Sequence, residues 1–340
     1  MHISRDNLCI SSYNCKGFKN RNYNYLKGLF DKSDVLLIQE HWLYDFEFGN
    51  FNNILSDGKY IAKSDMQNDI INHGRPHGGV AIIWKKSLVV EMTEINTLSN
   101  RLCAIRITSH DLDLILINIY MPCNDYNLND EFIEILFEIM TICNTYECSD
   151  IVTAGDFNCD VSLNDVRAHT LFDFVTSMKF ECLTLSPRFN IDYSFINSLN
   201  NKSLIDHLCV SKRIFESVIS FVRCDDGDNL SDHLPLILKI STKINYDGSL
   251  DNNNECQKVK INWGDANEQN IEDYIICLDK LLNEIDIPFN ALNCLNVKCT
   301  LHKVDYECFL NKILDSIELA TFTAIPVKFQ YDNANKKPQI

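Results

Sequence analysis

Two short motifs place side chains suited to phosphodiester chemistry beside apolar segments. Gly155-Asp156-Phe157-Asn158 follows the run Ile151–Ala154, and Ser231-Asp232-His233 precedes the run Leu234–Leu238. Carboxylate, amide and imidazole groups on strand ends can seat a metal ion, position a water molecule and donate to a phosphoryl oxygen. Either motif alone is weak evidence, because Gly-Asp turns and Ser-Asp caps are common beside strands.

Further polar residues occupy comparable positions elsewhere in the chain. Asn14 follows the run Leu8–Tyr13, and Glu40 follows the apolar run Val35–Ile38 by two residues. Tyr120 and Asp206 also lie in segments of this kind. A carboxylate at a strand end points into whatever cleft the sheet offers, which makes Glu40 a candidate site residue. Each residue also has a structural explanation, as a strand-end amide or a packed ring.

The composition indicates a cytoplasmic or nuclear protein with a large core. The chain has 340 residues, of which 46% are apolar, and 15 cysteines. The cysteine count is odd and the cysteines lie inside apolar segments, so we expect a reducing, intracellular location. We find neither a membrane-spanning run nor the apolar core of a signal peptide, and we expect a protein that is not secreted.

The net charge of −16 argues against tight nonspecific binding to DNA, because phosphate contacts need basic side chains. It does not exclude a DNA substrate, since an acidic metal site itself adds negative charge. Basic groups also flank the motifs, among them Lys16, His77 and Arg188.

Short β-branched segments recur up to about residue 242 and predict many strands. They alternate with a few amphipathic helices, of which residues 129–145 give the clearest pattern. This order predicts packed sheets with helices outside, an α/β sandwich.

The remaining sequence predicts a division of the chain. We expect a catalytic domain over residues 1–242, a polar linker over 243–258, a helical segment over 259–330 and a disordered tail over 331–340.

The motifs, taken in order, resemble the endonuclease/exonuclease/phosphatase superfamily. The resemblance implies the deoxyribonuclease I-like fold, an α/β fold that is a four-layer sandwich of two packed, mainly antiparallel sheets flanked by helices. The strings that carry the resemblance are Ser12–Gly17, Leu37–Trp42, Asn118–Pro122, Gly155–Asn158, Ile205–Leu208 and Ser231–His233. The resemblance implies Mg²⁺ or Mn²⁺ as the only cofactor. It also implies a role for each site residue: metal binding by Asn14, Glu40 and Asp232; catalysis by Tyr120, Asp156, Asn158, Asp206 and His233, with Asp206 orienting His233; and substrate binding by Lys16, His77 and Arg188.

Within that superfamily the chain looks like the endonuclease domain of LINE-type non-LTR retrotransposons. The strings Pro76–Ile82 and Leu230–Pro235 carry this closer resemblance, and residues 258–325 are similar to the segment that joins such domains to a reverse transcriptase. The sequence contains no polymerase motif. The resemblance implies an endonuclease that nicks DNA and has no membrane partner.

The sequence departs from the family patterns at two positions. Lys16 replaces a carboxylate of some cellular apurinic endonucleases, which puts a two-metal site and abasic-site activity in doubt. Arg188 follows Pro187, where the retroelement pattern often has Thr-Arg.

Two alternative functions stay open. A phosphatase or phospholipase of the same fold is the first alternative, although the inositol phosphatase signature is absent. The second is a catalytically silent nucleic-acid-binding remnant.

Overall fold

The computed structural model describes residues 2–18, 22–54, 58–66, 77–123, 129–146, 149–224, 228–247, 258–261, 263–283, 285–294 and 300–330. These residues belong to two compact units, one up to residue 247 and one from residue 258 onward. The predicted tail and residues 248–257 of the predicted linker lie outside the described residues.

The first unit contains a mixed sheet in which β1 (His2–Asn14) runs parallel to β2 (Val35–Gln39). The other strands of this sheet are antiparallel to their neighbours, and they are β3 (Gly58–Lys63), β4 (Val80–Lys85), β5 (Leu88–Val89), β14 (Val218–Arg223) and β15 (Leu236–Asp247). The order across the sheet is β14-β15-β1-β2-β4-β3, with β5 beside β15. β15 pairs with β1 as far as Asp247, so residues 243–247 are strand where we expected linker.

The second sheet has the order β10-β13-β9-β8-β7-β6. Its strands are β6 (Glu91–Ile95), β7 (Leu102–Thr108), β8 (Asp113–Tyr120), β9 (Asp150–Asp156), β10 (Glu181–Cys182) and β13 (Asp206–Val210). β8 and β9 are parallel and the other pairs are antiparallel. A short hairpin, β11 (Phe195–Ile196) with β12 (Lys202–Ser203), precedes β13.

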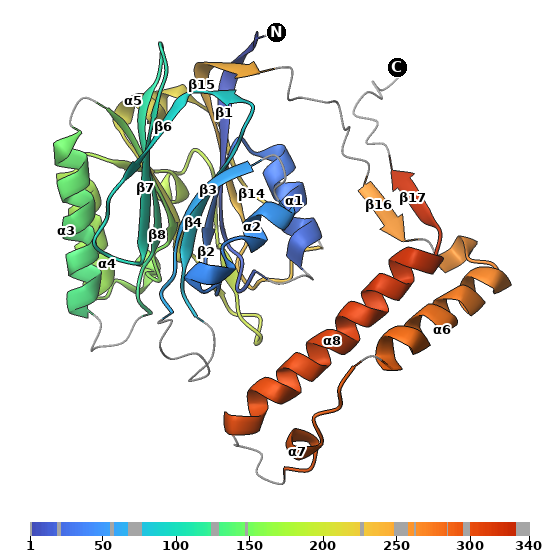
Figure 1. Ribbon diagram of the computed structural model, residues 1–340. Helices are drawn as coiled ribbons and strands as arrows, with labels where there is room; N and C mark the ends of the chain where they lie inside the picture. The colour runs from blue at the N-terminus through green and yellow to red at the C-terminus, as the bar shows by residue number, and fades with distance from the viewer. Residues whose placement is uncertain are drawn as a thin grey trace. The chain divides into compact units, whose positions relative to one another are not determined.

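The two sheets pack face to face and helices cover their outer faces, which confirms the predicted four-layer sandwich (Figure 1). On β2, Val35 and Leu37 join the core between the sheets, whereas Leu36 and Ile38 face the outer helices. Burial on both faces explains why this strand reads as a continuous apolar run. The outer layers are α1 (Tyr23–Lys32) and α2 (Asn50–Ile54) on one side, and α3 (Asn129–Thr145) and α4 (Val166–Ser177) on the other.

The helix α3 has the bounds that the sequence pattern predicts. Asp130 and Glu131 lie in its first turn, where acidic side chains favour the helix dipole. Its buried stripe packs on the second sheet and consists of Phe132, Ile135, Leu136, Ile139, Ile142 and Cys143. The remaining short elements of this unit are α5 (Lys212–Ser217) and the 3-10 turns Asp45–Glu47, Val161–Leu163 and Leu183–Leu185.

The second unit is smaller and mainly helical. α6 (Glu268–Asn283) packs along α8 (Thr300–Ala324), and α7 (Phe289–Leu292) contacts α8 as well. The unit also contains a 3-10 turn, Trp263–Asp265, and an antiparallel pair of strands, β16 (Lys258–Ile261) with β17 (Val327–Gln330), that the sequence did not predict. Among the described residues, no helix has the length and apolar character needed to cross a bilayer.

Candidate active site

The polar strand ends meet at one end of the first unit because the strand register brings them together. In the second sheet, Asp156 at the end of β9 lies between Tyr120 on β8 and Asp206 on β13. In the first sheet, Asn14 pairs with Gln39, and Glu40 follows directly. His233 lies three residues before β15, whose first residue pairs with Ser12 of β1. The two sheets therefore present their polar ends to a common space.

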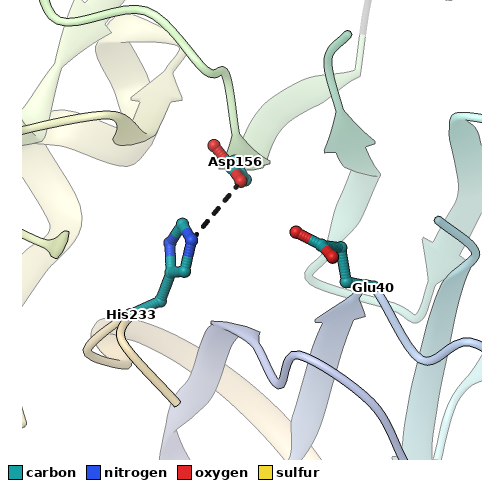
Figure 2. Close-up of side chains that lie close together, drawn as sticks. All are labelled: Glu40, Asp156 and His233. Atoms are coloured by element: carbon teal, nitrogen blue, oxygen red, sulfur yellow. Dashed lines mark ion pairs between the residues drawn. The ribbon is translucent and has the colours of Figure 1, made fainter. Parts of the chain in front are cut away.

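Asn14 links carboxylates from the two sheets. Its amide Nδ2 donates to Glu40 Oε1 and to Asp156 Oδ2, each at 2.9 Å. Ligand atoms of Glu40, Asp156 and His233 all lie within 4.8 Å of one another, and Figure 2 shows the three side chains pointing toward one another. Two carboxylates at this spacing form a possible seat for a metal ion, with the ring nitrogen of His233 beside them.

His233 is held by Asp206. The ring Nδ1 lies 2.9 Å and 3.1 Å from the two carboxylate oxygens of Asp206, and Nε2 lies 3.8 Å from Asp156 Oδ2 (Figure 2). The ring is almost fully buried and meets the edge of Phe195. Because Nδ1 is hydrogen-bonded to Asp206, Nε2 is the ring atom that faces Asp156.

Burial and neighbouring charges shift the ionisation of this group. Burial alone would lower the pKa of His233, but the carboxylates of Asp206 and Asp156 outweigh it and raise the pKa to about 9. Burial raises the pKa of Asp156 above its usual range, while the charge of His233 acts in the opposite direction. The site therefore concentrates negative charge that a cation would stabilise.

Asp156 and its neighbours require special backbone geometry. Gly155 has φ +149°, and a Cβ there would lie 1.9 Å from the carbonyl oxygen of Ile119 on the adjacent strand. Asn158 has φ 46°; its backbone N–H donates to Asp156 Oδ1 at 2.8 Å, and its side-chain amide donates to the carbonyl of Met121. The Gly-Asp-Phe-Asn motif thus fixes the Asp156 carboxylate in one orientation.

Tyr120 is buried beside the two carboxylates. Burial, together with the charges of Glu40 and Asp156, raises the pKa of its hydroxyl, so the phenol stays protonated. The guanidinium of Arg101 lies over its ring, 5.3 Å from the centroid. A protonated phenol at this position is a hydrogen-bond donor.

Residues without a predicted role support the site. Ser231 Oγ donates to the carbonyl of Asn14 and accepts from the backbone N–H of His233. Ser194 Oγ accepts from the backbone N–H of Asp206 at 2.9 Å. The Trp42 indole donates to Glu40 Oε2 at 2.9 Å. Ser194 has no sequence signal of its own, whereas Trp42 belongs to the Gln-Glu-His-Trp string.

Two of the expected metal ligands have other partners. Asp232 forms an ion pair with Lys16, and neither residue belongs to the group that includes Glu40 and Asp156. Asn14 turns its amide nitrogen toward the carboxylates, while its amide oxygen accepts from the backbone N–H of Lys16 at 3.1 Å. The structure thus places the Asn14 oxygen in a backbone turn.

The expected substrate-binding residues are not gathered together. Lys16 lies at the site through its pair with Asp232. His77 is exposed and precedes Gly78, whose carbonyl accepts from the Trp42 backbone N–H at 3.1 Å. Arg188 lies elsewhere: its guanidinium donates to the carbonyl of Val218 at 3.0 Å, at the opposite end of β14 from the site. This placement lies away from the other site residues, and the contact of Arg188 with the substrate stays a prediction.

Comparison with solved structures identifies the fold. The endonuclease domain of TRAS1, a telomere-specific non-LTR retrotransposon, is 14% identical with a TM-score of 0.54, covering 69% of this chain and 98% of that one. An AP endonuclease from Leishmania major is 15% identical with a TM-score of 0.57, covering 69% of this chain and 88% of that one. The 3′ phosphatase NExo from Neisseria, bound to a product DNA hairpin, is 15% identical with a TM-score of 0.52, covering 69% and 99%.

No curated protein matches the sequence. Residues 11–233, however, match the Endonuclease/Exonuclease/phosphatase family, and this range spans the residues of the candidate site, from Asn14 to His233. The match confirms the superfamily to which the sequence motifs pointed. Together with the deoxyribonuclease I-like fold, it establishes that the chain belongs to the endonuclease/exonuclease/phosphatase family.

Proposed function

We propose that this protein is a divalent-metal-dependent DNA endonuclease that nicks one strand of a duplex. Membership of the family supports phosphoester hydrolysis by a nuclease or phosphatase. The observation that carries the proposal is the convergence of Glu40 and Asp156 across the two sheets, with His233 held beside them by Asp206.

The donor set fits Mg²⁺ or Mn²⁺. Glu40 and Asp156 offer hard carboxylate oxygens, and the hydrogen bonds that they accept from Asn14 come from a neutral amide that adds no competing positive charge. The group has one histidine and no cysteine, fewer nitrogen and sulfur ligands than a typical Zn²⁺ site offers. We propose Glu40 as the principal ligand. When bound, the ion supplies charge stabilisation for the phosphoryl oxygens.

The protein groups have separable roles in this proposal. Asp156, fixed by the Asn158 backbone N–H, accepts a hydrogen bond from the attacking water. His233 donates from Nε2 to a phosphoryl oxygen, because its Nδ1 is bonded to Asp206. Tyr120 and Asn158 border the same space from β8 and the turn after β9, and the protonated Tyr120 hydroxyl adds a donor toward the phosphate.

Several observations support DNA as the substrate. The structural neighbours include a retrotransposon endonuclease domain and an AP endonuclease, and the phosphatase neighbour is bound to a DNA hairpin. Lys16 adds a positive charge beside the site. We further propose an origin in a LINE-type element and an intracellular location in the nucleus or cytoplasm; the free cysteines of the described chain support the location.

A plasmid assay tests the proposal. Purified protein is incubated with supercoiled plasmid in Mg²⁺, in Mn²⁺ and in EDTA. We expect open circles with either metal and none in EDTA. Glu40→Gln should reduce nicking by roughly 10²–10³-fold, whereas Glu134→Gln, an exposed residue on α3, should not change it. Equal cleavage in EDTA contradicts the metal, and release of phosphate from a 3′-phosphorylated oligonucleotide without nicking favours a phosphatase.

A further inference from the structure

The Trp42 indole donates a hydrogen bond to Glu40, the carboxylate that we propose as the principal metal ligand. Its Nε1–H donates to Glu40 Oε2 at 2.9 Å, while Asn14 donates to Glu40 Oε1 at the same distance. We propose that Trp42 is a positioning residue that sets the metal affinity of the site by fixing the Glu40 carboxylate. This inference rests on the proposed function, because it takes Glu40 as a ligand.

The local backbone is built to bring the indole to Glu40. Glu40 and Trp42 both have left-handed backbones, with φ 52° and 59°, a conformation that side-chain-bearing residues seldom adopt. The Trp42 backbone N–H donates to the carbonyl of Gly78 at 3.1 Å, and the Gly17 N–H donates to the carbonyl of Glu40 at 2.8 Å. Such a costly conformation persists only where surrounding contacts hold it.

Gly17 makes room for the indole ring. A Cβ at residue 17 would lie 2.5 Å from a ring carbon of Trp42, and Gly17 has φ +103°. The ring therefore packs directly on the main chain that follows Asn14. Asn14 at the end of β1 and Trp42 in the segment after β2 thus approach the Glu40 carboxylate, and each donates a hydrogen bond to one of its oxygens.

The chemistry of the donor matters as much as its position. An indole is a donor without an acceptor, so the hydrogen bond has one direction, and it carries no charge. Glu40 is thereby oriented without being neutralised. Asp232 illustrates the opposite case, because the ammonium of Lys16 pairs with it directly. Neutral donors around Glu40 leave its charge available to a divalent ion, as hydrogen bonds to ligating carboxylates do in metal sites.

Metal binding measured without substrate tests the inference. Free Mn²⁺ is followed by its electron paramagnetic resonance signal during titration of full-length protein. We expect Trp42→Phe to weaken Mn²⁺ binding roughly 10–100-fold, the usual effect of removing a hydrogen bond to a ligand. Trp84→Phe is the matched control, because Trp84 lies at the end of β4 remote from the Glu40 side and pairs with Val35; its affinity should equal that of the wild type.

The outcomes separate this inference from the proposed function. Absence of Mn²⁺ binding in the wild type, or unchanged binding in Glu40→Gln, overturns the metal assignment itself. Loss of binding in Glu40→Gln with wild-type affinity in Trp42→Phe overturns only the role of Trp42. If Trp42→Phe instead weakens binding of a DNA duplex in EDTA and leaves the Mn²⁺ affinity unchanged, the ring is a nucleic-acid contact and the inference is wrong.

A second measurement titrates the wild-type protein, and a variant serves only to assign one resonance. With ¹⁵N-labelled tryptophan, the spectrum has one indole N–H resonance for each of Trp42, Trp84 and Trp263. We expect Mg²⁺ to shift the Trp42 resonance, assigned by its absence in Trp42→Phe, with the same midpoint as metal binding. The resonances of Trp84 and Trp263 should not move. A Trp42 resonance that stays in place while the metal binds contradicts the inference.

Discussion

The two units of this chain use apolar residues in different ways. In the first unit the central strands are buried on both faces, and every residue of the candidate site belongs to it. In the second unit α6 has no buried side chain, and Ile275 and Ile276 are exposed. Strand ends anchored in a dense core can hold charged groups a few ångströms apart. We therefore expect catalysis to depend on the first unit alone.

The largest effect should follow from a change at Gly155, where two strands of the first unit lie too close together for a side chain. Gly155→Ala places a Cβ 1.9 Å from the Ile119 carbonyl oxygen, so strands β8 and β9 must separate. We expect a loss of more than about 4 kcal/mol of unfolding free energy, or no folded protein. Thermal and urea unfolding measure it. Gly28→Ala is the control, because nothing lies within 4 Å of a Cβ there in α1 and the variant should be slightly stabilised.

Next in size is the effect of the His233–Asp206 pair on rate. His233→Ala should slow nicking by about 10²–10⁴-fold, because the donor to the phosphoryl oxygen is lost. Asp206→Asn should cost a comparable factor, since the ring loses its orientation. The double variant should be little slower than the poorer single variant, because the two side chains act as one unit. His110→Ala, at an exposed position, is the control. Losses that multiply would mean that the residues act independently.

A smaller effect should distinguish Asp232 from Glu40. Because Asp232 is paired with Lys16, Asp232→Asn should change Mn²⁺ affinity by less than about 3-fold, well below the 10–100-fold typical of metal-supporting residues. A double-mutant cycle between Lys16→Ala and Asp232→Ala should give a coupling of about 0–1 kcal/mol in unfolding free energy, since both side chains are partly exposed. If Asp232→Asn weakens metal binding as much as Glu40→Gln, Asp232 is a ligand after all.

The smallest effect should come from removing the second unit. A chain of residues 1–247 should nick plasmid within about 2-fold of the full-length rate. A chain of residues 1–242 should be less stable by about 1–3 kcal/mol, because it lacks the end of β15 that pairs with β1 and β5. Unfolding and nicking of both chains check this boundary. An inactive but folded 1–247 chain would show that the second unit contributes to catalysis.

The sequence pattern predicted the sandwich for physical reasons, whereas the common site at the strand ends came from the family resemblance. A strand buried on both faces gives a continuous apolar run, and a polar residue that ends such a run lies at the edge of the sheet, as Glu40 and Asp156 do. The sequence pattern of α3 likewise predicts where the helix begins and ends, because acidic residues occupy its first turn and apolar residues recur on one face.

The structure departs most from the sequence-based expectations where a placement depends on side-chain direction or on distant pairing. Asp232 is adjacent to His233, but its carboxylate pairs with Lys16, whereas the His233 ring lies beside Asp156. Arg188 is near the motifs in sequence and yet lies at the opposite end of β14. β16 and β17 pair across the whole second unit, and such a nonlocal contact leaves little signal in either segment alone.

We propose that one divalent ion binds between the sheets at Glu40 and Asp156. Anomalous X-ray diffraction from crystals of the protein grown with Mn²⁺ locates that ion directly, without substrate. We expect a single strong peak within coordination distance of a Glu40 carboxylate oxygen, on the side that faces Asp156 and His233, and its loss in Glu40→Gln crystals. A peak at Asp232, or no peak near Glu40 in crystals that hold Mn²⁺ elsewhere, would contradict the account.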